Sequence, residues 1–388
     1  MKPRKSESPP RRLLERARFD RRSRIALGVG IALSYAGTYV LRTTETPWIA
    51  GACGTAGLIG LTVAARSRFG RTFALTLTAV LFALTALEWG VSTLRTASGR
   101  SRKYSAGFFR EHPWIGTAGP RNTTAWERRK RDGREVFHVE YKFDKNGQRP
   151  SFPAPNAEVT LLCFGGSFMF GEGIKDEETT AYRVGQRSGG RVRVYNFAFP
   201  GHGSHQMLSA LEHGVVKDIV KPAGRVHAVY WAMPDHIRRS AGYASWDYFG
   251  PRYVLEDGRP TFTGQFRDRF WRRYFHRSTL YRRYWLRLGG AGESECALYL
   301  AIAKESAARL AGLYDQTGFQ QVYWSDKRWN HHEAMRSLAE RTAVHPMTDV
   351  LPQDVPVEEF LIPGDGHPNA RCHDMLAAYI VEHLLGPG

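Results

Sequence analysis

The chain has 388 residues, 42% of them hydrophobic, and its 55 lysines and arginines against 37 aspartates and glutamates give a formal net charge of +18. This length suffices for two ordinary domains, or for one domain with additions. The four cysteines are too few for a disulfide framework, although the sequence leaves open whether Cys296 and Cys372 form a pair.

The positive charge is concentrated in two places. Residues 2–24 contain ten lysines or arginines against three acids, and residues 266–287 form a second basic cluster. Such basicity is typical of proteins that bind nucleic acid, but also of segments that meet anionic lipid or flank a membrane on its cytoplasmic side. The apolar segments between the two clusters distinguish these classes.

Three apolar runs follow the basic N-terminus. Residues 25–41 and 47–65 carry no charge, and residues 72–94 carry only Glu88, late in the run. Each run is long enough to cross a hydrocarbon core of roughly 30 Å. The short linkers predict an N-terminal helical segment of three transmembrane spans over residues 25–94, rather than a cleaved signal peptide with a single apolar region. A buried helical hairpin of a soluble protein is the alternative.

The basic residues predict the orientation of these helices. The N-terminal tail and the second linker, which carries three arginines, belong in the cytoplasm by the positive-inside rule. Three crossings then place everything after Leu94 outside. We therefore expect a multi-pass protein of the cell membrane, with a cytoplasmic tail (residues 1–24), membrane lipid as a partner and no nucleic acid. Glu88 would lie in the membrane interface or make a polar contact in the helix bundle.

The outer part divides into a connector and a larger domain. Residues 95–150 alternate apolar and polar side chains, which predicts a membrane-proximal connector with short strands. Residues 151–388 alternate apolar strands with helices, which predicts an α/β fold whose parallel sheet is covered on both faces. The expected strands are residues 159–164, 192–197, 226–231 and 322–325, and the expected helices are residues 179–187, 205–220, 294–314 and 370–385. The second basic cluster lies in an irregular insertion of this domain, over residues 240–290 or so.

Loops rich in glycine and polar residues adjoin these strands. Ser167 directly follows the first strand, Gly201 follows the second, and Asp235 and His236 follow the third. Residues 364–369 precede the last helix. Because functional loops of parallel sheets lie beyond the carboxyl ends of the strands, we expect these four loops to converge on one edge.

The loops carry the side chains of nucleophilic catalysis. A serine becomes a nucleophile when a histidine takes its proton and a carboxylate orients that histidine, and His367 and Asp365 are the candidates to serve Ser167. The backbone N–H groups of Ser167 and Gly201 are candidate oxyanion donors. Taken singly, each position also fits a glycine turn or an ordinary core histidine. The agreement of order, spacing and loop placement favours catalysis.

These residues also resemble a known family. The stretches "CFGGSFMFGEGI", "YNFAFPGHGSHQML", "VYWAMPDHIRRS" and "DGHPNARCHDMLAAYIVEHL" resemble the four sequence blocks of the SGNH hydrolase (GDSL-type esterase/lipase) superfamily. The resemblance covers roughly residues 156–388. It implies a flavodoxin-like three-layer α/β/α SGNH hydrolase domain that hydrolyses or transfers ester-linked acyl groups. It further implies Ser167 as nucleophile, His367 as base, Asp365 as its orienting acid and Gly201 as an oxyanion donor.

The chain departs from the family pattern in two blocks. Gly166 stands where relatives have an aspartate, which removes a side chain that normally braces the loop. Pro234 stands near the position of an oxyanion asparagine, so only two donors remain unless His236 contributes. Asp235 and His236 are candidate substrate-binding residues. The histidines and acids of these loops have no recognised metal-ligand spacing, so we expect no metal and no cofactor.

The insertion leaves several interpretations open. Residues 266–287 contain eight arginines and eight aromatic residues, as in an amphipathic helix, an interfacial lipid-binding segment or a surface that stacks on sugars. For the whole chain we expect a serine esterase or acyl (acetyl) transferase acting on an acyl ester of an envelope glycan or lipid, with envelope proteins as possible partners. The alternative is a catalytically degenerate extracytoplasmic domain that binds glycan or assembles an envelope complex.

Overall fold

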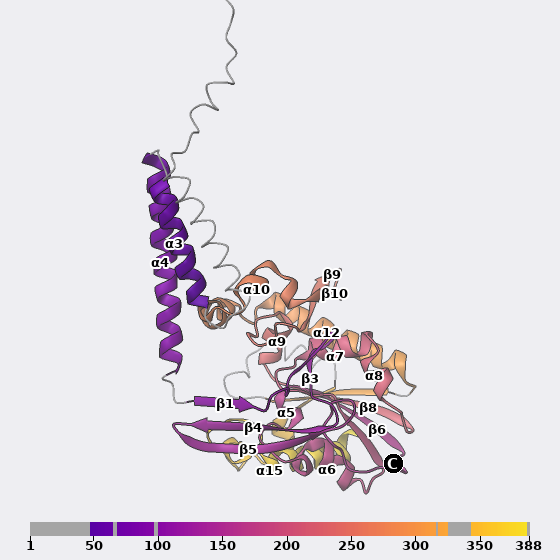
Figure 1. Cartoon of the computed structure of the whole chain (residues 1–388). Helices are drawn as coiled ribbons and strands as arrows, with labels where there is room; N and C mark the ends of the chain where they lie inside the picture. The colour runs from indigo at the N-terminus through magenta and orange to yellow at the C-terminus, as the bar shows by residue number, and fades with distance from the viewer. Residues whose placement is uncertain (1–46, 65–67, 97–99, 316, 325–342, 386–388) are drawn as a thin grey trace, which may run out of the picture. The chain divides into compact units, whose positions relative to one another are not determined.

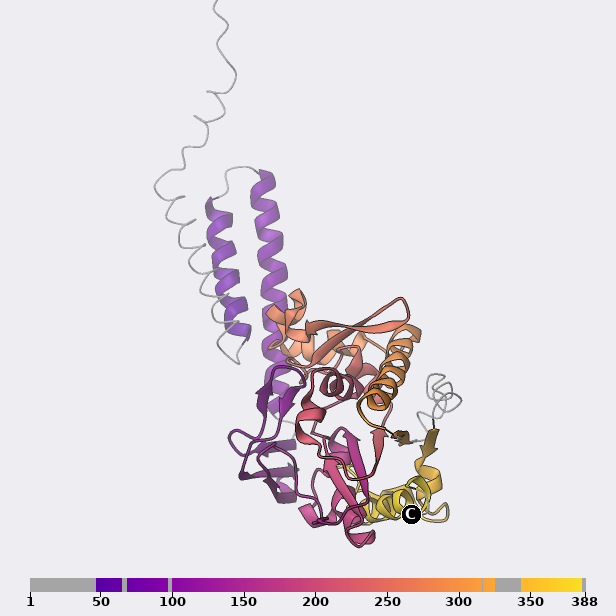
Figure 2. The same cartoon turned by 90° about the vertical axis from the view of Figure 1, so that its right-hand side faces the viewer.

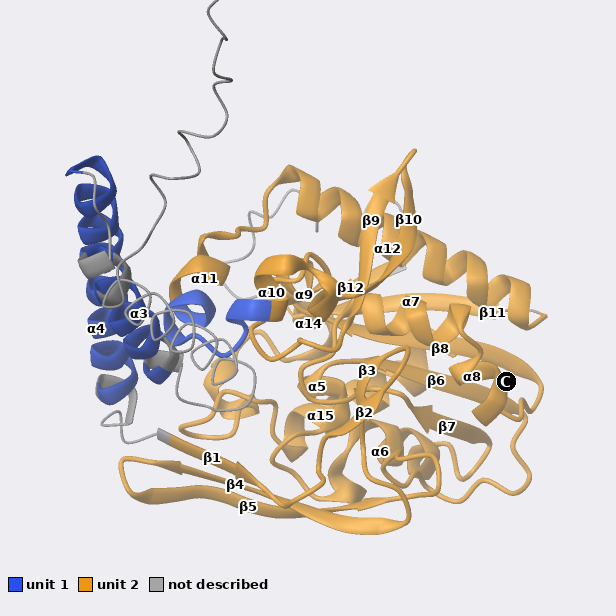
Figure 3. Ribbon diagram, turned by 45° about the horizontal axis from the view of Figure 1, so that its top comes forward, with its two compact units in different colours: residues 1–97, 274–283 blue, residues 98–273, 284–388 orange. Residues whose placement is uncertain are grey.

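The structure is a computed structural model, and it describes residues 47–64, 68–96, 100–315, 317–324 and 343–385 (Figure 1). The chain forms two compact units (Figure 3): residues 1–97 with 274–283, and residues 98–273 with 284–388. The expected cytoplasmic tail and the first expected transmembrane span lie outside the described residues. The two units are taken in turn below.

The first unit contains two packed helices, α3 (Pro47–Ala64) and α4 (Arg68–Thr96). They approach closely because α3 offers glycines: a Cβ on Gly51 would collide with Thr85 of α4, and one on Gly54 would lie 3.0 Å from Leu81. Among the described residues, only α4 is long and apolar enough to cross a membrane, over Arg68–Thr93. The structure therefore does not support the expected number of three spans.

The second unit is built on a five-stranded parallel sheet (Figure 1). Its strands are β6 (Val159–Gly165), β7 (Val192–Asn196), β8 (Arg225–Ala232), β11 (Thr317–Tyr323) and β12 (Ala343–Pro346), in the spatial order β12-β11-β8-β6-β7. Neighbouring strands run parallel throughout. Counted along the chain this is the order 2-1-3-4-5, which is flavodoxin-like. The predicted parallel α/β fold is confirmed.

Helices cover both faces of this sheet (Figures 1 and 2). Residues of β6 alternate between two cores because successive strand side chains point to opposite faces: Leu161 and Cys163 join one core, and Leu162 and Phe164 the other. Helices α6 (Thr180–Arg187) and α15 (Ala370–Tyr379) supply the first core, whereas α7 (Ser204–Glu212) and α12 (Glu293–Leu313) supply the second. The result is a three-layer α/β/α arrangement.

Local sequence explains where these helices begin and end. The hydroxyl of Thr179 accepts from the Tyr182 N–H at the start of α6, and the Asn369 side chain accepts from the Cys372 N–H at the start of α15. The helix expected over residues 205–220 is broken into α7 and α8 (Val215–Ile219) by Gly214, which has a φ of +77°. Strand β12 was not expected from the sequence.

Two smaller sheets lie N-terminal to β6. Strands β1 (Arg100–Tyr104), β4 (Thr123–Arg131) and β5 (Arg134–Phe143) form an antiparallel sheet, and β2 (Arg110–His112) pairs with β3 (Gly116–Ala118). In the β1–β4 pair, Arg102 lies opposite Arg129. Like charges in this position repel each other unless acids lie nearby, and such acids are found at the candidate site.

The basic insertion is not one amphipathic helix. Strands β9 (Pro251–Glu256) and β10 (Arg259–Gln265) form a hairpin, and short helical turns follow: α10 (Phe270–Phe275), a π-helix at Tyr281–Trp285 and α11 (Leu286–Leu288). All four cysteines have free thiols, so Cys296 and Cys372 are not joined.

Candidate active site

Ser167 lies where β6 gives way to the short helix α5 (Ser167–Phe170). This position is next to β8, at the point where the strand order reverses, which is where open parallel sheets bind ligands. Gly165 has a φ of +147°, a conformation that L side chains rarely adopt, and this explains the glycine before the turn. Because Ser167 is the first helical residue, its N–H has no intrahelical acceptor.

The serine meets His367 across the sheet edge. Nε2 of His367 lies 2.9 Å from Oγ of Ser167, and Nδ1 of the same ring is hydrogen-bonded to Oδ2 of Asp365. A carboxylate at Nδ1 favours the tautomer whose Nε2 is free to accept the serine proton. The structure thus brings together Ser167, His367 and Asp365, in the geometry of a nucleophile, its base and the acid that orients the base.

Two arginines of the β1–β4 sheet hold the acid. Arg129 forms an ion pair with Oδ1 of Asp365, and Nη2 of Arg102 lies 3.7 Å from the same oxygen. Burial by itself would raise the pKa of Asp365, but the hydrogen bond to His367 and the two guanidinium charges lower that pKa below its usual range. Asp365 is therefore held as an anion facing the imidazole.

Two further acids lie beside this pair. Glu172, from the turn after α5, forms an ion pair with Arg102, and its Oε1 lies 3.7 Å from Nε2 of His367. Oε1 of Glu127 lies 3.1 Å from Nε of Arg102, and its Oε2 accepts from the Tyr141 hydroxyl at 3.0 Å. Burial and the neighbouring Glu172 raise the pKa of Glu127 to about 9, although the charge of Arg102 opposes this shift.

The candidate oxyanion residue Gly201 lies on the loop after β7. Its φ is +87°, and its N–H makes no hydrogen bond with any other residue in the described part of the chain, so the group is available to a ligand. The side chain of Asn196 fixes this loop against α5, since its Nδ2 donates to the Met169 carbonyl at 3.2 Å. The indole of Trp246 donates to the Gly201 carbonyl at 3.1 Å.

Groups from two other segments of the chain fill the space beside Gly166. A Cβ on Gly166 would lie 2.8 Å from Nη1 of Arg239, 2.9 Å from the His202 carbonyl and 3.2 Å from Nε2 of His236. Nη1 of Arg239 donates to the His202 carbonyl at 2.8 Å. The guanidinium of Arg239 therefore braces the loops at the position where the family pattern predicts an aspartate, and a larger residue than glycine does not fit at position 166.

The two candidate substrate-binding residues have other contacts in this structure. Asp235 accepts from Nε of Arg239 at 2.8 Å and so fixes that guanidinium. His236 has no exposed surface, and its Nδ1 lies 2.6 Å from the Tyr230 hydroxyl. Burial and the charge of Arg239 hold the pKa of His236 well below its usual range, so the ring is neutral. His236 therefore lies behind the Ser167 loop and does not line an open cleft.

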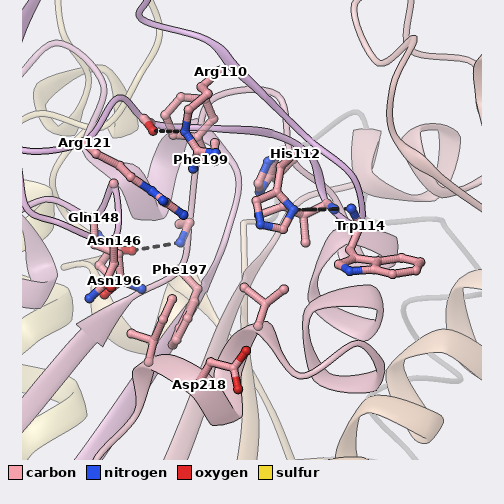
Figure 4. Close-up of a pocket in the computed structure, with 18 of the residues that line it drawn as sticks. Arg110, His112, Trp114, Arg121, Asn146, Gln148, Asn196, Phe197, Phe199 and Asp218 are labelled. Atoms are coloured by element: carbon pink, nitrogen blue, oxygen red, sulfur yellow. Dashed lines mark hydrogen bonds between the residues drawn. The ribbon is translucent and has the colours of Figure 1, made fainter.

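A cavity of about 380 Å³ adjoins the Gly201 loop (Figure 4). Arg110 and Arg121 lie on one side of it and Asp218 on the opposite side. Burial and the two guanidinium charges lower the pKa of His112, which also lines the cavity, to about 4. No member of the Ser167, His367 and Asp365 group lines this cavity.

Sequence reasoning did not identify Arg102, Arg129, Glu172 or Arg239 as site residues. Alternation in β4 places Glu127 and Arg129 on one face of the strand, but nothing in that pattern shows that this face meets Asp365. For Arg239 there was a signal, because Asp235 lies four residues earlier, a spacing that predicts an ion pair within a helix. Among the described residues, no group of three or more His, Cys, Asp or Glu side chains could hold a metal ion.

No protein-family model matches the chain, and no curated protein matches it. Several solved structures are similar in fold. A lipolytic protein of the G-D-S-L family from Veillonella parvula is 11% identical, with a TM-score of 0.35 over 59% of this chain and 100% of that one. The psychrotrophic esterase EstA from Pseudoalteromonas sp. is 13% identical, with a TM-score of 0.34 over 58% and 99%.

A third similar structure is a carbohydrate esterase whose active site is described as having divergent catalytic and non-catalytic binding functions. It is 11% identical, with a TM-score of 0.35 over 74% of this chain and 98% of that one. All three TM-scores are below 0.5, so these similarities by themselves assign no activity to this chain.

Proposed function

We propose that this protein is a serine ester hydrolase of the SGNH type. The observation that carries the proposal is the contact of 2.9 Å between His367 Nε2 and Ser167 Oγ, with Asp365 at the other ring nitrogen. The four sequence blocks that resemble the SGNH family support it. So does the place of Ser167 at the switch point of a flavodoxin-like sheet.

The reaction follows from these atoms. As Oγ of Ser167 bonds to the acyl carbon, its proton passes to Nε2 of His367, and Asp365 stabilises the charged ring. The N–H groups of Ser167 and Gly201 receive the developing oxyanion. His367 then returns the proton to the departing alkoxide and leaves an acyl-serine. A water, or a hydroxyl of an acceptor, attacks that ester and gives its proton to His367. His367 passes this proton to the departing Oγ of Ser167, which restores the serine.

The substrate class and the cellular setting belong to the same proposal. Helix α4 would anchor the protein in the cell membrane, with the hydrolase unit outside the cytoplasm. An acyl ester of an envelope glycan or lipid is then the substrate within reach. Release to water makes the protein an esterase, and release to a sugar hydroxyl makes it an acyl (acetyl) transferase.

A Ser167→Ala variant tests this proposal. Turnover of a chromogenic acetyl ester is expected to fall to background while thermal unfolding stays as in the wild type, because the hydroxyl is removed without a change in packing. A Ser204→Ala variant is a matched control, since that buried hydroxyl contacts Ser240 and lies outside the triad. Wild-type activity in the Ser167→Ala variant would show that Ser167 is not the nucleophile.

The competing proposal is a binding module without catalysis. It is favoured by Pro234, which cannot donate from its backbone and stands where an oxyanion asparagine is expected. A fluorophosphonate probe separates the two proposals, because it forms an adduct only with an activated serine. A hydrolase gives an adduct at Ser167 that the Asp365→Asn variant loses, whereas a binding module gives none.

A further inference from the structure

Glu88 in α4 binds a distant part of the chain within the first unit. It is 6% exposed, and its carboxylate accepts from the Ser278 hydroxyl at 2.7 Å, from the Leu280 N–H at 3.1 Å and from the Thr279 N–H. The Ser92 hydroxyl adds a contact of 3.0 Å to the hydroxyl of Thr279. Residues 278–280 of the insertion are thus fastened to the apolar helix by hydrogen bonds within the first unit.

The position of Glu88 along α4 sets the level of this attachment. Glu88 follows Arg68 by twenty residues, and at 1.5 Å per residue the two lie about 30 Å apart along the helix axis. That length matches the hydrocarbon thickness of a bilayer, roughly 30 Å. If Arg68 lies at one membrane face, then Glu88 and the segment it binds lie at the opposite face, where the lipid headgroups begin.

The attached segment has the side chains that suit this level. Residues 274–283 belong to the first unit, and α10 and the π-helix run from this segment into the residues on either side of it. Large apolar side chains are exposed here, namely Phe270 (63%), Trp271 (58%), Tyr284 (52%), Trp285 (63%) and Leu288 (80%). Exposed arginines alternate with them at positions 269, 273, 283 and 287. Aromatic rings with arginines are typical of the boundary between headgroups and acyl chains.

We propose that residues 269–288 form a membrane-interface element that binds the surface of an anionic phospholipid bilayer, at a depth fixed by Glu88. The argument for this partner is charge complementarity together with attachment to the candidate span α4. The negative potential of an anionic membrane surface attracts each exposed arginine that lies near it. The proposal rests on α4 as a membrane anchor and is independent of the ester chemistry.

Membrane binding would give the insertion a role that is separate from the candidate active site. It would bring residues 269–288 to the headgroup level, where an acylated lipid or a lipid-linked glycan carries its ester. A surface for soluble polyanions would need the arginines but not the four exposed side chains of Phe270, Trp271, Trp285 and Leu288.

The test uses the full chain in mixed phosphatidylcholine–phosphatidylglycerol vesicles, with brominated lipids that quench tryptophan near the headgroups or near the bilayer centre. Wild-type emission is expected to be quenched by the shallow bromines. A Trp271→Phe/Trp285→Phe variant is expected to lose the part of that quenching that Trp89 of α4, which lies next to Glu88 and is 55% exposed, does not supply. Trp114→Phe is the control, because this partly exposed indole stacks on His213 and is not in the element. Shallow quenching that is unchanged in the double variant would overturn the proposal.

Two further variants test charge and depth. Arg283→Gln/Arg287→Gln is expected to lose the extra shallow quenching that anionic vesicles give over neutral ones. Glu88→Ala is expected to weaken shallow quenching while the chain still resists alkaline extraction, because α4 stays in the bilayer. Extraction of the wild-type chain by alkali would show that α4 is no anchor. Equal quenching in neutral and anionic vesicles would overturn the choice of partner, and neither result bears on Ser167.

Discussion

The two sides of Ser167 are built in different ways. On one side, His367 and Asp365 lie in line with Ser167, as a base and its orienting acid would, and arginines from a separate antiparallel sheet hold the acid. On the other side, the aspartate expected before the serine is absent, and Arg239 of α9 (Asp235–Ser240) fills its place. On the side of His367, the residues of the proposed proton transfer are present and two arginines support them. On the side of the oxyanion, the loop is present, but a different residue, Arg239, braces it.

This difference shows that the loop at Gly166 is braced by a residue that its own sequence block does not contain. The sequence alone suggested that Gly166 weakens the loop. In the structure, glycine is required there, because the guanidinium of Arg239 and the carbonyl of His202 leave no room for a Cβ. The guanidinium of Arg239, on the neighbouring helix, donates to the His202 carbonyl and so braces this loop.

The largest effect is expected from Asp365→Asn. An amide at this place no longer fixes the tautomer in which His367 accepts the serine proton, and such a change typically lowers kcat about 10⁴-fold. Steady-state turnover of an acetyl ester measures it. Asp374→Asn is the control, since Asp374 also pairs with an arginine, Arg187, but on the surface, and it should keep full activity. Comparable activity in both variants would remove Asp365 from the mechanism.

Gly166→Ala tests the oxyanion side. The new methyl group would lie 2.8 Å from Arg239 and 2.9 Å from a backbone carbonyl that cannot easily move. We expect the free energy of unfolding to fall by about 1–3 kcal/mol, as in other overpacked cores, together with a loss of activity. Chemical denaturation measures the first effect. Gly312→Ala is the control: this glycine is at an exposed position of α12, a Cβ there would have no atom within 4 Å, and the variant should not be destabilised. An active, stable Gly166→Ala variant would restore the family-based interpretation.

Arg129→Gln tests the support behind Asp365. Its side chain is 23% exposed, so we expect a modest effect, roughly tenfold in kcat/KM. Loss of the guanidinium raises the pKa of Asp365, so the acid limb of the pH–rate profile is expected to move to higher pH. Arg128→Gln is the control, because alternation along β4 points that residue to the other face. An unshifted pH profile in Arg129→Gln would show that the charge of Arg129 does not support Asp365.

The sequence was sufficient to predict four of the five strands of the parallel sheet, all but β12. The apolar run before Ser167 and the glycine-rich loops after it indicate a parallel sheet, and parallel strands bring their carboxyl ends to one edge. The convergence of Ser167 and His367, which are 200 residues apart in sequence, follows from that rule. No side-chain contact had to be known in advance.

The supporting charges could not be predicted in the same way. Residues 95–150 were expected to be a connector, and their alternating pattern gives no sign of what one face of β4 meets. Arg102 and Arg129 acquire their role only when the β1–β4 sheet packs beside the loop of Asp365. The role of Arg239 likewise depends on the lack of a side chain at Gly166, in another loop. Such roles arise from tertiary contacts between segments that are distant in sequence.

The last prediction, for Glu127→Gln, concerns how stability depends on pH and does not concern activity. The pKa of Glu127 is raised to about 9 in the folded chain, above its value of 4.5 in an unfolded chain. Between these values the folded state binds the extra proton, so the contribution of Glu127 to stability is full at low pH and is lost as the pH rises toward 9. Glutamine does not ionise, so the Glu127→Gln variant does not lose this stability as the pH rises. Urea unfolding at pH 6 and pH 9 should therefore show a smaller fall in stability for Glu127→Gln than for the wild type. An equal fall would mean that Arg102 and Tyr141 already hold Glu127 as an anion in the folded protein.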